Sequence, residues 1–223
     1  MKKSLLLLLP LVATSAQAVY VDVRHEYLDD SKANYDRAYI SHRFDNGFGF
    51  AIEAISKSGG DDSNKAFNDM EVQGNEYTAS YQFTTGAVAW QPGIVLETGN
   101  GYSVYKPYFR ATWKLDDSWW LGARYRYEYV RRSSDIRDDD TINRMDVWAG
   151  YKWNKFDWTL EGIYKRADKY DLYDNSKNNY EYNFRTAYLT GNWSPFIEVG
   201  NVSVRSTSDE RQTRFRIGVG YTF

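Results

Sequence analysis

Apolar and polar residues alternate one by one over long stretches of this chain, which is the period of a β-strand because successive side chains point to opposite faces. From Trp119 to Tyr129 the odd-numbered residues are aromatic or aliphatic, whereas Arg124, Arg126 and Glu128 are even-numbered. The end of the chain, 214–223, alternates in the same way. Each such segment would form a strand with one apolar face and one charged face.

The same pattern predicts about twelve strands, each near the length needed to cross a bilayer at a tilt. The connections between them alternate between short turns at 45–47, 84–86, 115–118, 154–155 and 190–192 and longer polar segments at 59–70, 133–140, 167–177 and 206–209. This alternation is typical of bacterial transmembrane barrels. We therefore expect an all-β fold, a transmembrane antiparallel β-barrel with an up-and-down meander, whose strands lie near 19–28, 34–45, 48–58, 71–84, 87–98, 104–114, 119–131, 141–153, 156–166, 178–189, 194–203 and 211–223.

Aromatic residues support a membrane barrel over a soluble one. They make up 17% of the chain, and Phe44 with Phe48 and Trp113 with Trp119 bracket two of the short turns on the apolar face. Aromatic side chains gather at membrane interfaces. A soluble lipocalin-like barrel or a β-sandwich is the alternative, but it would expose these rings to water. The mean hydropathy of −0.68 averages lipid-facing with lumen-facing residues and does not exclude a barrel.

The first residues have the features of a secretory leader. Met1–Lys3 is basic, 5–13 is apolar, and Ala16-Gln17-Ala18 offers small residues to a signal peptidase. We expect 1–18 to be a signal peptide and 19–223 to be the barrel, located in the outer membrane of a Gram-negative bacterium. With no cysteine, the chain has neither a disulfide nor a lipidated thiol. A formal net charge of −2 gives no basic footprint for nucleic acid, so no nucleic acid partner is expected.

The alternation assigns a set of basic side chains to the inside of the barrel. Inward acids accompany them, so two interpretations are open: the basic residues bind an acidic oligosaccharide, or they pair with the acids and only line the wall. Lys106 with Arg110 and Arg124 with Arg126 favour binding, because we expect few inward acids on that part of the wall. The predicted substrate-binding and pore-lining residues are Arg24, Arg37, Arg43, Lys106, Arg110, Arg124, Arg126, Arg144, Lys152, Arg185, Arg214 and Arg216, with Lys165 on the same face.

Catalysis is not favoured by the sequence. The two histidines, His25 and His42, fall on the outward face, and no spacing typical of a metal site or a phosphate-binding glycine loop is present. We therefore expect no catalytic residue, metal or cofactor. The inward Tyr20, Tyr39 and Tyr108 are candidates for stacking on sugar rings. An outer-membrane enzyme and a closed structural barrel are the competing classes.

Several segments resemble the oligogalacturonate-specific porin family of the KdgM type. They are 21–26 with 40–49, 105–110, 123–127, 195–202 and 209–219, of which the last is the most specific. The loops 59–70 and 167–177 show no such similarity. The resemblance implies a monomeric twelve-stranded barrel in which facing basic tracks admit oligomers from pectin breakdown, and it marks as pore residues Arg43, Arg110, Arg124, Arg126, Arg214 and Arg216.

The implied function is passive uptake of acidic oligosaccharides, with oligogalacturonate as the expected partner. A sialic-acid channel of the same fold is the alternative, since close relatives in this family carry that sugar. Other expected partners are outer-membrane lipid, lipopolysaccharide and the machinery that inserts barrels. The terminal Phe223, with Tyr221 two positions before it, resembles the signal that this machinery recognises.

Overall fold

The computed structural model describes residues 19–133 and 137–223. The predicted signal peptide, 1–18, lies outside the described residues, as do three residues of the predicted loop 133–140. Within the described residues, no helix is long and apolar enough to cross a membrane.

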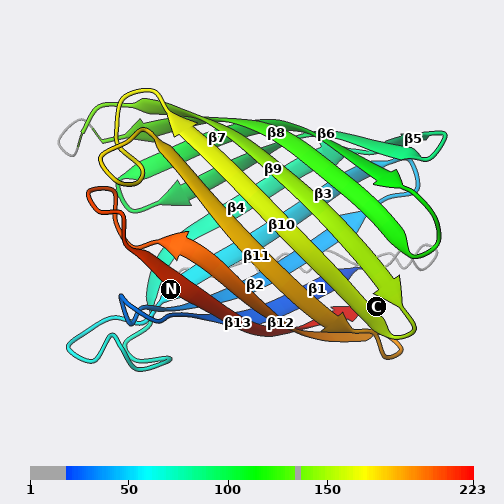
Figure 1. The fold of residues 1–223 in the computed structure, drawn as a ribbon, viewed down its shortest axis with the longest axis horizontal. Coiled ribbons are helices and arrows are strands. Elements are labelled where there is room, and N and C mark those ends of the chain that lie inside the picture. Colours follow the sequence, from blue (N-terminus) through cyan, green and yellow to red (C-terminus); the bar gives the residue numbers. More distant parts are fainter. Residues whose placement is uncertain (1–18, 134–136) are drawn as a thin grey trace, which may run out of the picture.

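The structure consists of antiparallel strands joined in chain order (Figure 1). Twelve of them are long, and β5 is a three-residue continuation of β4. The strands are β1 (Tyr20–Leu28), β2 (Asn34–Arg43), β3 (Phe48–Lys57), β4 (Glu71–Tyr81), β5 (Phe83–Thr85), β6 (Val88–Gly99), β7 (Tyr102–Lys114), β8 (Trp119–Arg132), β9 (Asp140–Trp153), β10 (Phe156–Ala167), β11 (Asn178–Tyr188), β12 (Trp193–Ser203) and β13 (Arg211–Thr222).

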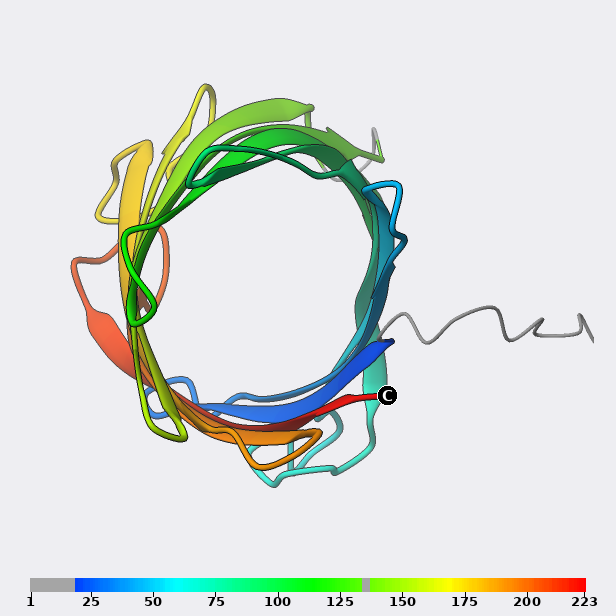
Figure 2. The same ribbon diagram turned by 90° about the vertical axis from the view of Figure 1, so that its right-hand side faces the viewer.

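The sheet closes on itself. The long strands pair in chain order, β4 and β5 both pair with β6, and β1 pairs with β13 from Tyr20↔Thr222 to Leu28↔Arg214. Seen along its axis, the molecule is a complete ring of strands (Figure 2). The predicted meander barrel of about twelve strands is therefore confirmed.

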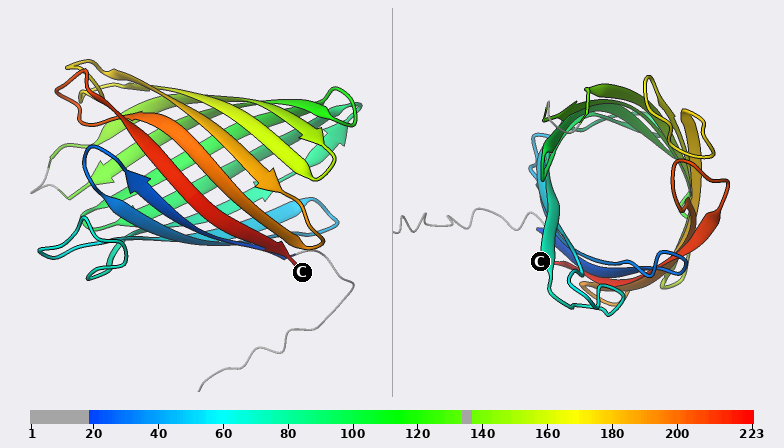
Figure 3. Two further views of the ribbon diagram at one scale, coloured as in Figure 1. Left: turned by 60° about the horizontal axis from the view of Figure 1, so that its bottom comes forward. Right: turned by 90° about the vertical axis from the view of Figure 1, so that its left-hand side faces the viewer.

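The two ends of the barrel differ. Five short turns lie at one end, which we call the short-turn end, and the longer loops lie at the other, the long-loop end, together with the two-residue turn between β6 and β7 (Figure 3). The first described residue and the last residue also lie at the short-turn end, where the Phe223 N–H donates a hydrogen bond to the Val19 carbonyl at 2.9 Å. This arrangement matches the even number of membrane crossings expected from the loop lengths.

The outer face of the barrel is largely apolar, and among the described residues only the loop 58–70 covers part of it. Ile217 is 62% exposed, Leu160 55% and Phe50 55%, whereas the inward Asp146 is completely buried. At the short-turn end, outward rings contact each other: the centroids of Trp119 and Tyr151 lie 4.5 Å apart. An apolar wall with aromatic rings at its border is suited to lipid.

Placing a charge on this wall should destabilise the barrel in a bilayer. For Ala123→Arg, midway between the aromatic residues at the two ends of β8, we expect the free energy of unfolding to fall by about 2–4 kcal/mol, the cost of a guanidinium facing lipid near the bilayer midplane. Urea unfolding in liposomes would measure the loss. Thr112→Arg on the neighbouring strand points into the lumen and serves as the control. Equal losses in both variants would contradict a lipid-facing outer wall.

Candidate functional site

Large inward rings lie over glycines of neighbouring strands. Trp120 pairs with Gly150, and Tyr108 pairs with Gly93. A Cβ atom added to either glycine would overlap the ring. The glycines therefore leave room for the rings along the wall, so that these bulky side chains take up less of the lumen. The same contact joins Trp148 to Gly122, Phe196 to Gly218 and Tyr20 to Gly220.

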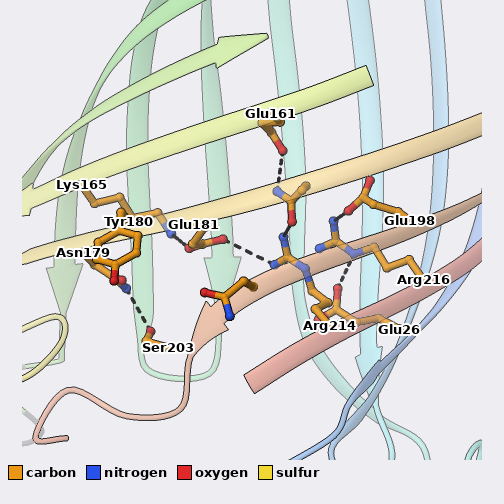
Figure 4. Close-up of polar contacts among 12 residues, drawn as sticks. Glu26, Glu161, Lys165, Asn179, Tyr180, Glu181, Glu198, Ser203, Arg214 and Arg216 are labelled. Carbon is orange, nitrogen blue, oxygen red and sulfur yellow. Dashed lines mark hydrogen bonds and ion pairs between the residues drawn. The ribbon is translucent and has the colours of Figure 1, made fainter. Parts of the chain in front are cut away.

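A chain of ion pairs crosses the inner face of β10 to β13 and β1 (Figure 4). Arg216 lies between two carboxylates, 2.6 Å from Glu26 and 2.7 Å from Glu198. Next to it, Arg214 contacts Glu181 at 3.5 Å, and Glu181 also pairs with Lys165 at 2.6 Å. Each of these basic side chains is therefore matched by at least one acid.

Asparagine and glutamate side chains extend this network toward β9. Arg214 donates a hydrogen bond to Asn183, and Asn183 donates one to Glu161 at 2.7 Å. Glu161 also accepts the indole N–H of Trp148 at 2.9 Å. The polar chain thus links β13 to β9, at the edge of the wall formed by β7 to β9.

The wall formed by β7 to β9 differs from the sequence-based expectation. Asp146 lies between Arg124, at 2.9 Å, and Arg144, at 2.7 Å. Arg126 pairs with Glu128 two residues further along the same strand, at 2.7 Å. The prediction of few inward acids here was wrong, because cross-strand register and an i,i+2 neighbour bring carboxylates to these arginines.

The neighbouring part of the inner face, from β1 to β7, is also rich in pairs. Lys106 is buried between Glu76, at 2.8 Å, and Glu97. Arg24 and Arg37 share Glu53, and Arg37 lies 3.6 Å from it. The remaining member of the paired set, Lys152, lies 3.5 Å from Asp157 near the short-turn end.

Three of the twelve predicted residues, Arg43, Arg110 and Arg185, have no carboxylate within ion-pair distance in the described part of the chain. Arg43 is tied to the rim of the barrel, since it donates hydrogen bonds to the Gly47 carbonyl at 2.8 Å and to the Ser80 hydroxyl at 3.0 Å. These hydrogen bonds hold the 43–48 turn against β4.

Arg110 and Arg185 are held by aromatic rings. The guanidinium carbon of Arg110 lies 4.7 Å from the Trp148 ring centroid, and that of Arg185 lies 4.0 Å from the Phe196 centroid. Stacking of this kind holds a cation through the ring face and leaves its N–H edge directed elsewhere. The Nε atoms of both arginines are buried and lack a hydrogen-bond partner among the described residues. These two guanidiniums are the least neutralised charges on the inner wall.

Water reaches the inner wall. The side chains of Arg24 and Arg37 are each 24% exposed, and those of Glu76 and Lys165 are 23% and 22% exposed, although the ring of strands encloses them. A cation that faces an enclosed aqueous space within a low-dielectric wall attracts anions more strongly than one on an open surface. The arrangement is therefore chemically suited to transient binding of carboxylates.

Some partners in this site could not be found in the sequence. Trp148 and Phe196 were not candidates, although they hold Arg110 and Arg185. Their inward position follows from the alternation, but the stacking depends on which residues face each other across strands. Of the predicted stacking tyrosines, Tyr108 lies over Gly93 and Tyr20 lies 6.2 Å from Tyr39 in an edge-on contact.

At the long-loop end, two loops lie against each other. Asn175 N–H donates to the Ser206 carbonyl at 2.9 Å, and the Tyr173 hydroxyl donates to the Asp209 carbonyl at 2.5 Å. A hydrogen bond from Arg205 lowers the pKa of the nearby Glu210 carboxyl below its usual range. The loops 168–177 and 204–210 therefore form a joined part of the rim.

A closed membrane-spanning barrel with a charged, hydrated inner wall defines a porin-type channel of the outer membrane. The family described as oligogalacturonate-specific porin protein (KdgM) matches residues 12–223. Because the match covers nearly the whole chain, the protein belongs to the oligogalacturonate-specific porin (KdgM) family.

Individual relatives agree with this assignment. The chain is 84% identical to the uncharacterized protein YiiY of Salmonella typhimurium over 223 residues, covering 100% of this chain and 98% of the relative. It is 39% identical to the oligogalacturonate-specific porin KdgM of Dickeya dadantii, covering 96% and 95%. A solved structure of a KdgM porin aligns with a TM-score of 0.65 at 28% identity, covering 92% of this chain and 99% of the other.

The chain is also similar to channel proteins that are named for a different sugar, N-acetylneuraminic acid. The N-acetylneuraminic acid outer membrane channel protein NanC of Escherichia coli K12 is 27% identical, with 92% of this chain and 91% of the relative covered. Bacterial outer-membrane barrels have short periplasmic turns and longer extracellular loops, a rule that assigns the short-turn end of this barrel to the periplasm and the long-loop end to the outside of the cell.

The contact between inward rings and glycines should set the width of the lumen. For Gly150→Ala, we expect a lower single-channel conductance in planar bilayers, because the new methyl group displaces the Trp120 ring toward the lumen. Gly162→Ala is the matched control, since Gly162 faces lipid and its added Cβ would meet only Val147. An unchanged conductance in Gly150→Ala would show that the ring does not limit the flow of ions.

Proposed function

We propose that the protein is a passive channel for acidic oligosaccharides, with oligogalacturonates from pectin breakdown as the expected substrates. The observation that carries the proposal is that Arg110 and Arg185 face the lumen and have no carboxylate partner among the residues that the structure describes. Each guanidinium offers a planar set of N–H donors that matches a carboxylate. Membership of the family and the 39% identity to a porin named for oligogalacturonate support this choice of sugar.

The arrangement of strands supports tracks that face each other. In the ring, β7 and β13 are separated by half of the strands, and so are β8 and β1. Arg110 and Arg124 thus belong to the wall opposite Arg214, Arg216 and Arg24. A uronic acid chain carries one carboxylate per sugar ring, so charges on both sides could be engaged in turn as the chain moves through.

The paired basic residues have a different part in this proposal. Nine of the twelve predicted residues contact a carboxylate, which reduces their net field and holds each side chain in place. They can exchange a carboxylate partner for one on the substrate only by breaking an existing pair. Weak binding of this kind favours passage over retention, as a channel requires. We propose no chemical step.

A sialic-acid channel is the second candidate. The 27% identity to NanC over most of both chains favours it, and sialic acid also presents a carboxylate on a pyranose ring. Liposome uptake separates the candidates when it is measured for oligogalacturonate, for sialic acid and for a neutral oligosaccharide with the same number of sugars as the oligogalacturonate. We expect the fastest uptake for oligogalacturonate. Equal rates for the acidic and neutral sugars would contradict both candidates.

The two ring-stacked arginines should dominate ion selectivity. For the double variant Arg110→Gln with Arg185→Gln, we expect the anion preference, measured as the reversal potential across a salt gradient in planar bilayers, to decrease. Oligogalacturonate uptake should slow in the same variant. Arg131→Gln is the control, because it removes the same charge from an exposed side chain on the outer face of β8. An unchanged reversal potential in the double variant would remove these residues from the mechanism.

A further inference from the structure

A short row of polar side chains interrupts the apolar outer wall. His25, Asp36 and Ser56 lie side by side on β1, β2 and β3, on the face directed away from the lumen. The Nδ1 atom of His25 lies 2.8 Å from Asp36 Oδ1. The other carboxylate oxygen of Asp36, Oδ2, is buried and has no hydrogen-bond partner among the described residues. Polar groups at this depth are costly unless a partner satisfies them.

A groove of about 930 Å³ lies beside this row on the outer wall. Val23, Ala38, Ala54 and Val219 form a second row across β13, β1, β2 and β3, one step closer to the periplasmic end. Because these side chains are small, they form a depression between larger outward side chains such as Ile217 and Met70. The groove runs across the strands, and His25 and Asp36 form part of its lining. Its floor is continuous with the lipid-facing wall.

The loop 58–70 bends over the outer side of the barrel and closes one end of the groove. This segment lies outside the ring of strands in both axial views (Figures 2 and 3). The Phe67 ring lies 5.1 Å from the His25 ring, and the Asn34 side chain donates a hydrogen bond to the Ser63 carbonyl at 3.4 Å. Phe67 and Met70 are 62% and 49% exposed and also line the groove. The loop therefore extends the apolar surface of the groove.

We propose that this groove binds one acyl chain of an outer-membrane lipid whose hydroxyl or amide group donates a hydrogen bond to Asp36. A hydrocarbon chain suits this groove because the groove is apolar and is part of the wall that already faces lipid. The unpartnered Asp36 Oδ2 needs a donor, which an unmodified, ester-linked chain lacks. A phosphate or carboxylate brought to the same point would meet another acceptor oxygen. The site is separate from the lumen and does not depend on the transported sugar.

Native mass spectrometry of the barrel released from lipid nanodiscs would test this proposal. The probes are two lipids with the same headgroup and chain length, one with an amide-linked 3-hydroxyacyl chain and the other with an ester-linked chain without the hydroxyl. We expect one copy of the first lipid to stay bound per barrel, with about tenfold preference over the second, as for one hydrogen bond to a charged acceptor. Equal retention of the two lipids would overturn the proposal.

Three variants sharpen the test. Ala54→Phe fills the groove and should abolish retention, whereas Ala149→Phe adds the same ring to the lipid-facing surface of β9 and should leave it unchanged. Asp36→Leu should remove the preference for the hydroxylated amide lipid. Heat-modifiable migration on gels checks that each variant forms the barrel. Equal retention by Ala54→Phe and the unmodified protein, or a dimer mass that only Ala54→Phe removes, would refute the lipid site.

Discussion

Closure of the hydrogen-bonded ring is the constraint on which this structure depends. In lipid, an open sheet edge would leave a row of unsatisfied N–H and C=O groups, each costing several kcal/mol. The pairing of β1 with β13 over nine residues removes that edge. Once the ring is closed, the alternation of side chains leaves only two environments, and every residue of a strand must suit either lipid or an enclosed aqueous space.

The enclosed space brings many charged side chains close together, and most basic side chains on the inner wall pair with a carboxylate. Carboxylates placed between two basic groups, such as Asp146 between Arg124 and Arg144, hold side chains that would otherwise repel each other. Aromatic rings perform the corresponding task for Arg110 and Arg185 without cancelling their charge. Arg110 and Arg185 therefore differ from the paired cations in being held without a salt bridge among the described residues, and the proposed function assigns the attraction of a passing anion to these two.

Much of the fold could be predicted from the sequence, because period-two alternation and loop length report directly on a barrel's two faces. The strand ranges, the closed meander and the inward parity of the basic residues needed no long-range information. The identity of the residue that each inward side chain contacts did require such information. Lys106 is thirty positions from Glu76, and Arg216 is far from Glu26 in sequence, yet register across strands places each pair in contact. Because the register between strands is not visible in the sequence, the rings beneath Arg110 and Arg185 were not predicted. For the same reason, the wall at β7 to β9 was expected to be more positive than it is.

The contact of inward rings with glycines links residues that are distant in the chain. Trp120 occupies the space that a side chain at position 150 would need, so the two positions share one volume. A homologous channel with a larger residue at one position should carry a smaller residue at the other. In this way a barrel with a fixed number of strands can acquire channels of different bore, through paired exchanges on neighbouring strands and without any change in its backbone.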